Sequence, residues 1–381
     1  MINTENISNS QHSIQTSLRR LQIIIAGGGT GGHIFPAIAI ANAIKRKRPL
    51  SDILFVGAEG KMEMEKVPEA GYKIIGLPIA GYNRSSIFKN INLPFKLIKS
   101  FLKVRQIVSQ FKPDAVIGVG GYSTFPILRY AQSIGIPTFI HEANSFAGKS
   151  NIILARRATK VFVATENMNQ FFPYKNLIVT GNPVRNVFTE SNIIRKEAVE
   201  FFGLQTTFKT VLVIGGSLGA KSINETIENN IGFFTKNNIQ LIWQTGKSYA
   251  PAAAILEEHH TNIWTNSFIT KMEYAYAAAD VVVSRSGAMS VSELCVVGKP
   301  VIFVPYPHAA EDHQFANAMN LVNKKAALMV KDDQVSDKLI ITIESLLKNE
   351  EVCLEMKENI SKLANVNADE KIAEEILKII E

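Results

Sequence analysis

The sequence predicts an α/β protein with two doubly wound parallel-sheet domains. The chain has 381 residues, which is more than one hydrophobic core usually serves. A short apolar run that enters a glycine-rich loop and then a helical stretch occurs twice, once near the start of each half. Further short apolar runs alternate with helical segments along the chain, as parallel sheets with helical crossovers require.

The first half opens with the apolar run 21–26 (LQIIIA), which has the length of a buried parallel strand. It enters the loop 27–32 (GGGTGG), and a helix is predicted over 36–47 with Pro36 at its first position. The other strands predicted in this half are 53–56, 115–119, 138–140, 161–163 and 177–180.

The second half repeats this opening. The strand 211–214 (VLVI) enters the loop 215–219 (GGSLG), and a helical stretch starts at Ala220. The turn Gly181-Asn182-Pro183 predicts the boundary between the halves, so we expect domains over 21–183 and 184–365. The other strands predicted in this half are 239–244, 281–283 and 301–304.

The two ends of the chain lie outside these predicted domains. Residues 1–20 are polar and lack the apolar stretch of a secretory signal, so we expect a flexible tail. A final helix is predicted within 366–381. No run of about 18 apolar residues occurs, so no membrane-spanning helix is expected.

Composition narrows the classes of ligand. The formal net charge of +7 suits an anionic partner such as a nucleotide, a nucleic acid or an acidic lipid headgroup. The two cysteines, Cys295 and Cys353, form no CxxC pair and fit a reducing cytosol. No Asp-x-Asp pair stands at a strand end, so we expect neither an essential metal nor a cofactor.

The loop 27–32 contains the pattern GxGxxG, which alone is a weak signal. Glycines there let backbone N–H groups approach an anion at a helix N-terminus, or they simply permit tight packing. An NAD-dependent oxidoreductase is therefore an alternative, with Glu59 standing slightly late for the acidic residue of a dinucleotide site. A third glycine loop at 119–124 (VGGYST) favours a cleft between domains over one dinucleotide crevice.

Seven motifs resemble those of glycosyltransferase family 28, a family of the two-domain class called GT-B. The resemblance runs from about residue 21 to the C-terminus. It implies two Rossmann-like domains that face each other across a cleft, with the last helix packed back on the first domain. The motifs are GGGTGGHIFPA at 27–37, GVGGYSTFP at 118–126, HEANSFAGKSN at 141–151, GNPVR at 181–185, GGSLGA at 215–220, SRSGAMSVSE at 284–293 and EDHQFANA at 311–318.

The HEAN and GNPVR segments favour the cell-wall members of this family. They imply an inverting transfer of N-acetylglucosamine from UDP-N-acetylglucosamine to the muramyl 4-hydroxyl of undecaprenyl-pyrophosphoryl-MurNAc-pentapeptide, in peptidoglycan synthesis, cell shape and division. The implied location is the cytoplasmic face of the bacterial plasma membrane, as a peripheral protein, with cell-wall synthesis proteins as further partners. Another UDP-sugar glycolipid synthase remains an alternative.

A non-catalytic module that binds nucleic acid is a third hypothesis. It would use the basic surface, but the chain lacks the aromatic signatures of RNA-binding domains, and the glycine loops would remain unexplained. No nucleic-acid partner is expected.

The resemblance assigns the acceptor side of the site to the first half. His33 would take the proton of the attacking hydroxyl, which suits imidazole near neutral pH, although a capping or packing histidine has the same pattern. Thr30, Gly31 and Gly32 immediately precede it and would contact UDP-N-acetylglucosamine.

Two residues of the HEAN motif are further candidates. Glu142 is a second titratable group for catalysis, or it orients a partner or pairs with a cation. Asn144 would exchange hydrogen bonds with sugar hydroxyls, or would form a turn or cap. Family members often have Gln where Ala143 stands.

The donor side is implied in the second half. Arg185 would clamp the diphosphate through its guanidinium, with Ser217 as a further phosphate contact. Glu293 would accept hydrogens from both ribose hydroxyls, although an exposed helix glutamate is the alternative. The backbone at Phe268-Ile269 would contact uracil, and Gln314 would contact the hydroxyls of N-acetylglucosamine. Phosphate-binding N–H groups are implied at Ala288, Met289, Ser290, Val291 and Ser292.

The stretch 79–108 is the candidate for membrane contact. Phe95, Ile98, Leu102 and Arg105 recur at helical spacing with lysines between them, as in helices that lie on anionic lipid. A helix packed on its own core with a solvated basic face has the same pattern. The lipid-linked substrate favours an anionic membrane surface as a partner.

Overall fold

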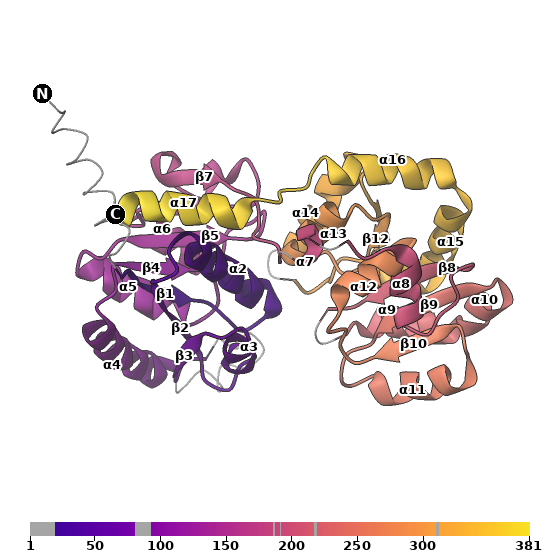
Figure 1. Ribbon diagram of the computed structural model, residues 1–381, viewed down its shortest axis with the longest axis horizontal. Helices are drawn as coiled ribbons and strands as arrows, with labels where there is room; N and C mark the ends of the chain where they lie inside the picture. The colour runs from indigo at the N-terminus through magenta and orange to yellow at the C-terminus, as the bar shows by residue number, and fades with distance from the viewer. Residues whose placement is uncertain (1–19, 81–92, 186, 191, 217–218, 310–311) are drawn as a thin grey trace, which may run out of the picture. The chain divides into compact units, whose positions relative to one another are not determined.

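The computed structural model describes the chain except residues 1–19, 81–92, 186, 191, 217–218 and 310–311. The predicted N-terminal tail thus lies almost wholly outside the described residues. The chain divides into two compact units, drawn in Figure 1. The first comprises Met1–Val184 and Asn367–Glu381, and the second comprises Arg185–Val366.

The first unit is built on a parallel sheet with the strand order β3-β2-β1-β4-β5-β6-β7. The central strand β1 pairs with β2 and β4, with Ile24 opposite Leu54 and Val116. The bounds are β1 (Gln22–Ala26), β2 (Asp52–Ala58), β3 (Lys73–Leu77), β4 (Ala115–Gly118), β5 (Thr138–Glu142), β6 (Lys160–Val163) and β7 (Leu177–Val179).

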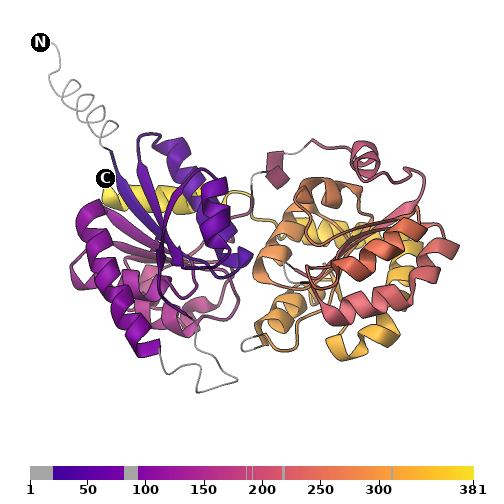
Figure 2. The ribbon, with the colours of Figure 1, turned by 90° about the horizontal axis from the view of Figure 1, so that it is seen from below.

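Helices cover both faces of this sheet because successive side chains of each strand point to opposite faces. Ile23 and Ile25 of β1 pack in the core formed with α2 and α17, whereas Ile24 packs in the core formed with α4 and α5. Figure 2 shows helices on both sides of the sheet. The helices are α2 (Gly31–Lys47), α3 (Glu63–Glu69), α4 (Leu93–Phe111), α5 (Thr124–Ser133), α6 (Lys149–Ala155), the short η2 (Met168–Gln170) and η3 (Tyr174–Asn176), and α17 (Ala368–Ile380).

The start of α2 differs from the sequence prediction. The helix begins at Gly31, so Pro36 lies inside it rather than at its first position. The carbonyl of Thr30 already accepts the N–H groups of His33 and Ile34, which closes the first turn before the proline. Because Pro36 lacks an N–H, the helix gives up the bond that this group would make to Gly32.

The last helix, α17, packs against α2 within the first unit. Ile372, Ile376 and Leu377 are buried in the core that α2 also lines. At the basic end of α2, the Arg46 guanidinium lies 2.7 Å from the Asp369 carboxylate, and Asp369 is itself buried. Apolar contact and charge pairing therefore both hold the C-terminal segment on the first unit.

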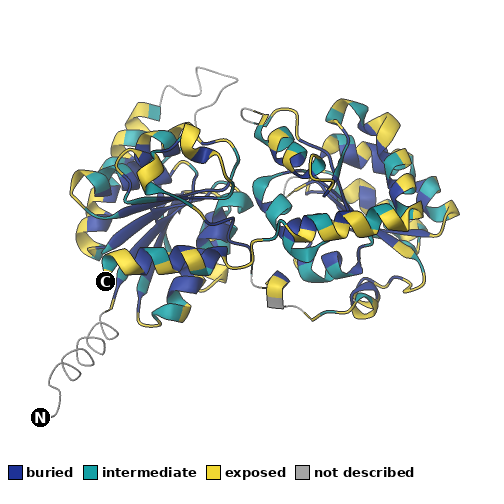
Figure 3. Cartoon of the chain, turned by 90° about the horizontal axis from the view of Figure 1, so that it is seen from above, coloured by how far each residue is buried: buried dark blue, intermediate teal, exposed yellow. Residues whose placement is uncertain are grey.

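The second unit has a parallel sheet with the strand order β10-β9-β8-β11-β12-β13. Its central strands β8, β9, β11 and β12 are almost entirely buried, whereas the edge strand β13 is only half-buried, and the dark blue strands of Figure 3 show the buried residues. The strands are β8 (Lys209–Ile214), β9 (Ile239–Gln244), β10 (Ile263–Asn266), β11 (Val281–Ser284), β12 (Val301–Phe303) and β13 (Leu328–Met329). The helices are α7 (Val187–Glu190), α8 (Arg195–Phe201), α9 (Lys221–Asn229), α10 (Ile231–Lys236), α11 (Ala250–His259), α12 (Met272–Ala278), α13 (Ala288–Val297), α14 (His313–Val322), η5 (Asp332–Gln334), α15 (Val335–Lys348) and α16 (Glu350–Ser361).

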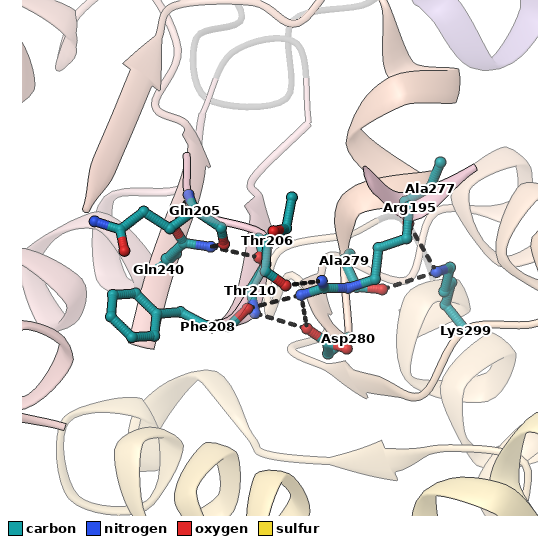
Figure 4. Close-up of polar contacts among 10 residues, drawn as sticks. All are labelled: Arg195, Gln205, Thr206, Phe208, Thr210, Gln240, Ala277, Ala279, Asp280 and Lys299. Atoms are coloured by element: carbon teal, nitrogen blue, oxygen red, sulfur yellow. Dashed lines mark hydrogen bonds and ion pairs between the residues drawn. The ribbon is translucent and has the colours of Figure 1, made fainter. Parts of the chain in front are cut away.

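A polar cluster closes the amino edge of this second sheet (Figure 4). The Arg195 guanidinium donates to the carbonyl oxygens of Thr206 and Phe208 and to the Asp280 carboxylate, at 2.7 to 2.9 Å. Asp280 also accepts the N–H of Thr210 at the start of β8. This edge is therefore tied together by its own side chains.

The two sheets share one topological feature. Strand order reverses between β1 and β4 in the first unit and between β8 and β11 in the second. Ligands of open α/β sheets bind at the carboxyl edge beside such a reversal. The glycine loops that follow β1, β4 and β8 stand at these points, as does the segment 285–287 that follows β11.

Candidate active site

Two glycine loops of the first unit meet beside the strand-order reversal. The N–H of Gly28 donates to the carbonyl of Gly120 at 3.2 Å. Gly121 has a φ of +92°, and a Cβ there would lie 2.4 Å from the carbonyl oxygen of Gly28. Only a glycine at position 121 permits this close approach of the two backbones.

His33 lies over this junction, in the first turn of α2. Its Nδ1 is 2.9 Å from the carbonyl oxygen of Gly28. A carbonyl can only accept a hydrogen bond, so Nδ1 carries the hydrogen and Nε2 of the neutral ring keeps its lone pair. A Cβ on Gly120 would lie 2.7 Å from Nε2, so the ring fits because residue 120 is glycine.

The predicted residues Thr30, Gly31 and Gly32 form the start of α2 next to His33. Thr30 is exposed, and the two glycines are half-buried. Their N–H groups stand at the beginning of the helix, where the backbone ladder supplies no acceptor. These positions are open to a polar or anionic group of a substrate.

Glu142 ends β5 and is buried. One carboxylate oxygen accepts the backbone N–H and the side-chain amide of Asn144, both at 3.1 Å. The other accepts the N–H of Gly148 at 3.0 Å and the side-chain amide of Asn151 at 2.9 Å. Three donors from the loop after β5 and one from α6 favour a positioning role for Glu142, with Asn144 as the residue that it positions.

A buried histidine precedes this glutamate in β5. Burial, together with a smaller contribution from the nearby His33, lowers the pKa of His141 to about 4, although hydrogen bonds with Gly181 and Asn182 act in the opposite direction. The ring is therefore neutral under physiological conditions. Sequence reasoning did not single out His141, although its place at the end of a predicted strand was a usable signal.

In the second unit, two predicted residues that are 108 positions apart in sequence lie together. The Arg185 guanidinium is 3.2 Å from the Glu293 carboxylate. The hydroxyl of Tyr276 donates to the same carboxylate at 3.3 Å. The ring of Phe188 lies 4.5 Å beneath the guanidinium and supports it from below.

Burial dominates the electrostatics of this cluster. It raises the pKa of Glu293 above the usual glutamate value, although the charge of Arg185 and its hydrogen bond act in the opposite direction. Burial and the Glu293 charge also raise the pKa of Tyr276 well above its ordinary range, so the phenol stays protonated and donates. The carboxylate is thus incompletely compensated and would gain from further donors such as ribose hydroxyls.

The residues predicted to bind phosphate form the start of α13. The first backbone bond into this helix runs from Val291 N–H to the carbonyl of Gly287, at 3.0 Å. The N–H groups of Ala288, Met289 and Ser290 therefore lie at the helix N-terminus, on the carboxyl edge of the sheet. The Ser292 hydroxyl donates back to the carbonyl of Ala288 at 3.0 Å.

Gln314 is tied to the same loop. Its side-chain oxygen accepts the N–H of Tyr306 at 3.0 Å, and its carbonyl accepts the hydroxyl of Ser286 at 2.8 Å. The side-chain amide of Asn317 in turn donates to the carbonyl of Ser286 at 3.1 Å. The beginnings of α13 and α14 are therefore held as one polar surface.

A glutamine that sequence reasoning missed links the remaining donor-side segments. The side chain of Gln244 accepts the N–H of Ile269 and donates to the carbonyl of Gly216, both at 2.9 Å. It thereby fixes the predicted uracil-contacting backbone relative to the glycine loop that follows β8. Ser217, the other predicted phosphate contact, lies outside the described residues.

Arg285 was also missed, although it stands two residues after the strand predicted over 281–283 and within the motif at 284–293. Its guanidinium lies 2.5 Å from the Asp332 carboxylate and donates to the carbonyl of Val304 at 3.0 Å. Tyr276 offered no such signal, because it sits within a helix at a position typical of core residues.

The described residues offer neither a metal site nor a membrane-spanning helix. Those residues contain no group of three His, Cys, Asp or Glu side chains arranged to hold a metal ion. Across the same residues, no helix combines the length and apolar character needed to span a bilayer.

Both halves of the chain match family models. Residues 23–163 match the glycosyltransferase family 28 N-terminal domain, and residues 210–376 match the family 28 C-terminal domain.

Proteins from two bacteria are similar over almost their whole length. One from Parabacteroides distasonis is 47% identical over 366 residues, which cover 96% of this chain and 100% of the relative. One from Christiangramia forsetii is 49% identical over 360 residues, with coverage of 94% and 98%. Both are named UDP-N-acetylglucosamine–N-acetylmuramyl-(pentapeptide) pyrophosphoryl-undecaprenol N-acetylglucosamine transferase.

Solved structures share the fold. MurG of Acinetobacter baumannii superimposes with a TM-score of 0.73 at 28% identity, covering 94% of this chain and 100% of that one. A UDP-GlcNAc 2-epimerase of Neisseria meningitidis, bound to UDP-GlcNAc, gives a TM-score of 0.67 at 18% identity, covering 93% and 100%. At that identity the epimerase is informative about the fold alone.

Proposed function

The chain belongs to glycosyltransferase family 28, and we propose that it transfers N-acetylglucosamine from UDP-N-acetylglucosamine to undecaprenyl-pyrophosphoryl-linked N-acetylmuramyl-pentapeptide. The observation that carries this proposal is the 47% identity to a transferase of that name, over 96% of this chain and all of the relative. The chain is accordingly a hexosyltransferase of peptidoglycan synthesis. The roles of individual residues below are proposals that the geometry supports.

The second unit is proposed to bind the donor. Glu293 would accept both ribose hydroxyls, which supply the donors that its buried carboxylate needs. Arg185, 3.2 Å from Glu293, is near enough to turn its guanidinium to the adjoining diphosphate. The N–H groups at the start of α13 would stabilise the charge that develops on the leaving UDP.

Gln314 and Ile269 would complete the donor site. Gln314 is anchored through its side-chain oxygen, so its amide nitrogen remains to donate to a hydroxyl of the sugar. The N–H of Ile269 is already bonded to Gln244, which leaves its carbonyl as the group that would accept from uracil.

His33 is proposed as the catalytic base in the first unit. The acceptor hydroxyl oxygen would attack the anomeric carbon as the bond from that carbon to the β-phosphate oxygen of UDP breaks. The proton of the hydroxyl would pass to Nε2, the ring nitrogen that the contact with Gly28 leaves unprotonated. Attack from the face opposite the leaving group inverts the anomeric centre.

Asn144 is proposed to orient the sugar hydroxyls beside this base. Both its backbone N–H and its side-chain amide donate to Glu142, so its side-chain oxygen remains as an acceptor. Glu142 would then act through Asn144 rather than on the reacting atoms. A change of Glu142 to Gln should disturb acceptor binding more than UDP binding.

The helix α4 is proposed to contact the membrane that carries the acceptor. Phe95, Ile98 and Leu102 are 68%, 59% and 63% exposed, whereas Val104 and Ile107 on the other side of α4 are buried in the core. Lys96, Lys99 and Arg105 accompany the exposed ridge. Apolar side chains flanked by cations favour a peripheral position on an anionic leaflet, here the cytoplasmic leaflet of the plasma membrane.

The transfer is tested directly with the full-length protein. Incubation with UDP-N-acetylglucosamine and the lipid-linked muramyl-pentapeptide should yield UDP and a lipid-linked disaccharide, detected by mass spectrometry. A parallel titration should give binding of UDP and none of NADH. Absence of the disaccharide, together with preferred binding of NADH, would reject the proposed function in favour of an oxidoreductase.

A further inference from the structure

A buried glutamate that the proposed reaction does not use lies beneath the first glycine loop. Glu63, the first residue of α3, is fully buried. One of its carboxylate oxygens accepts the N–H of Gly29 at 2.8 Å, and the other accepts the N–H of Ala58 at 2.9 Å. Within the described part of the chain, no basic side chain forms an ion pair with it.

Glycines make the room that this side chain occupies. A Cβ on Gly28 would lie 2.1 Å from the Glu63 carboxylate, and a Cβ on Gly57 would lie 2.5 Å from its Cγ. Gly57 stands inside the strand β2, where glycine weakens a strand unless another group needs the space. The Glu63 side chain therefore fits between the glycine loop and β2 because positions 28 and 57 both lack a Cβ.

The two contacts of the Gly28–Gly29 peptide connect Glu63 to His33. The N–H of this peptide, on Gly29, donates to Glu63. The C=O of the same peptide, on Gly28, accepts from Nδ1 of His33 at 2.9 Å. A carboxylate and an imidazole thus hold opposite ends of one amide.

We propose that Glu63 is a positioning residue that acts on His33 through the Gly28–Gly29 peptide. This proposal rests on the proposed function, in which His33 is the base. The carboxylate fixes the orientation of the peptide, so its carbonyl faces Nδ1 and holds the tautomer whose lone pair is on Nε2. Hydrogen bonds in a chain also polarise one another, so the carboxylate strengthens the bond from Nδ1 to the carbonyl.

In some enzymes a carboxylate orients a catalytic histidine by a direct hydrogen bond. Glu63 would perform the same task through one intervening peptide group. Groups that orient metal-binding histidines typically affect activity by about 10- to 100-fold when they are removed, and we expect a similar range for Glu63. The matched change is Glu63→Gln, which keeps the shape but turns an NH2 group toward one of the two backbone N–H groups. We expect kcat to fall by that factor, while the Kd for UDP, which the second unit binds, stays unchanged.

The tautomer of His33 is the decisive readout. The seven histidines are labelled with 15N, and His33 is assigned by the loss of its signals in His33→Ala. Long-range 1H–15N spectra at about pH 8.5, above the ordinary histidine pKa, should give a protonated Nδ1 and an unprotonated Nε2. In Glu63→Gln the two nitrogens should shift toward a mixture of tautomers.

The control is Glu65→Gln, on the same helix, whose side chain is 73% exposed. It should change neither the tautomer nor kcat. A wild-type His33 protonated on Nε2 would overturn the proposal without any variant, so the test survives a Glu63→Gln protein that fails to fold. An unchanged tautomer in folded Glu63→Gln would overturn it as well.

The outcomes separate this proposal from the proposed function. If His33→Ala kept full activity while Glu63→Gln altered the tautomer, the base assignment would fail and the link from Glu63 to His33 would stand. If His33→Ala lost activity while Glu63→Gln left the tautomer unaltered, the link would fail and the proposed function would stand.

Discussion

Glu293→Gln is expected to separate stability from function in the second unit. The Glu293 side chain is 10% exposed, with Arg185 at 3.2 Å and Tyr276 at 3.3 Å. Burial nevertheless outweighs both partners and raises the pKa of Glu293. The folded protein therefore holds a proton at this carboxyl more tightly than the unfolded chain does.

The sign of the pH dependence follows from this difference. Below the ordinary pKa of glutamate, the carboxyl is protonated in both the folded and the unfolded state. No charge is then buried, so this group does not lower the free energy of unfolding. As pH rises from that value through the raised pKa, the unfolded state loses its proton first, so the free energy of unfolding falls. A neutral glutamine avoids this loss, and Glu293→Gln should be at least as stable as the wild type at neutral pH.

The same change should weaken UDP binding. The glutamine side chain presents one neutral oxygen in place of two charged ones, so at least one hydrogen bond to a charged group is lost. Such a bond contributes about 1.5–3 kcal/mol, which corresponds to a Kd for UDP raised by roughly 10- to 150-fold. Because ribose would bind the ionised form, wild-type affinity should rise with pH through the raised pKa of Glu293, and the variant should lose this dependence.

Calorimetric titration with UDP and urea unfolding at several pH values measure the two effects. The matched control is Glu273→Gln, whose side chain is also 10% exposed and whose nearest cation, Lys271, is 3.8 Å away. Its Kd for UDP should equal that of the wild type. Equal UDP affinity in Glu293→Gln would refute the ribose assignment, and a lower stability than Glu273→Gln at neutral pH would refute the electrostatic argument.

Three further predictions address the first unit. His33→Ala should lower kcat by about 10²- to 10⁴-fold at an unchanged Kd for UDP, as loss of a general base does, and full activity would exclude this role. Ile376→Ala, in the fully buried face of α17, should lower the free energy of unfolding by about 2–5 kcal/mol in urea, and no loss would contradict the packing of α17 on α2. Leu102→Glu should reduce sedimentation with anionic vesicles without affecting the fold, whereas Gln106→Glu, exposed on the same helix, adds the same charge and should have a smaller effect.

Uninterrupted apolar runs made most of the fold predictable from sequence. The strand predicted over 239–244 has those bounds in the structure, because every one of its side chains is buried. Three strands escaped prediction for physical reasons. β3 contains a glycine, β10 carries polar residues, and β13 has only two residues, so none forms an apolar run.

The sequence motifs identified residues of the candidate site, but they did not identify which of those residues contact one another. Arg185 and Glu293 were each singled out, but their pairing depends on tertiary contacts that no local pattern encodes. The acidic residue sought after the second strand illustrates the same limit. Glu59 was the candidate, yet it pairs with Lys103 at 2.9 Å on the surface, whereas Glu63 turns toward the glycine loop.

The two glycine loops begin from the same strand–loop–helix unit, yet their surroundings suit different ligands. In the first, the N–H groups of Gly28 and Gly29 are taken by a carbonyl and by the buried Glu63 carboxylate, which leaves the N–H groups of Thr30, Gly31 and Gly32 for a substrate. In the second unit, the guanidinium of Arg185 and the N-terminus of α13 offer positive charge at the carboxyl edge of the sheet. A nucleoside diphosphate is therefore favoured in the second unit.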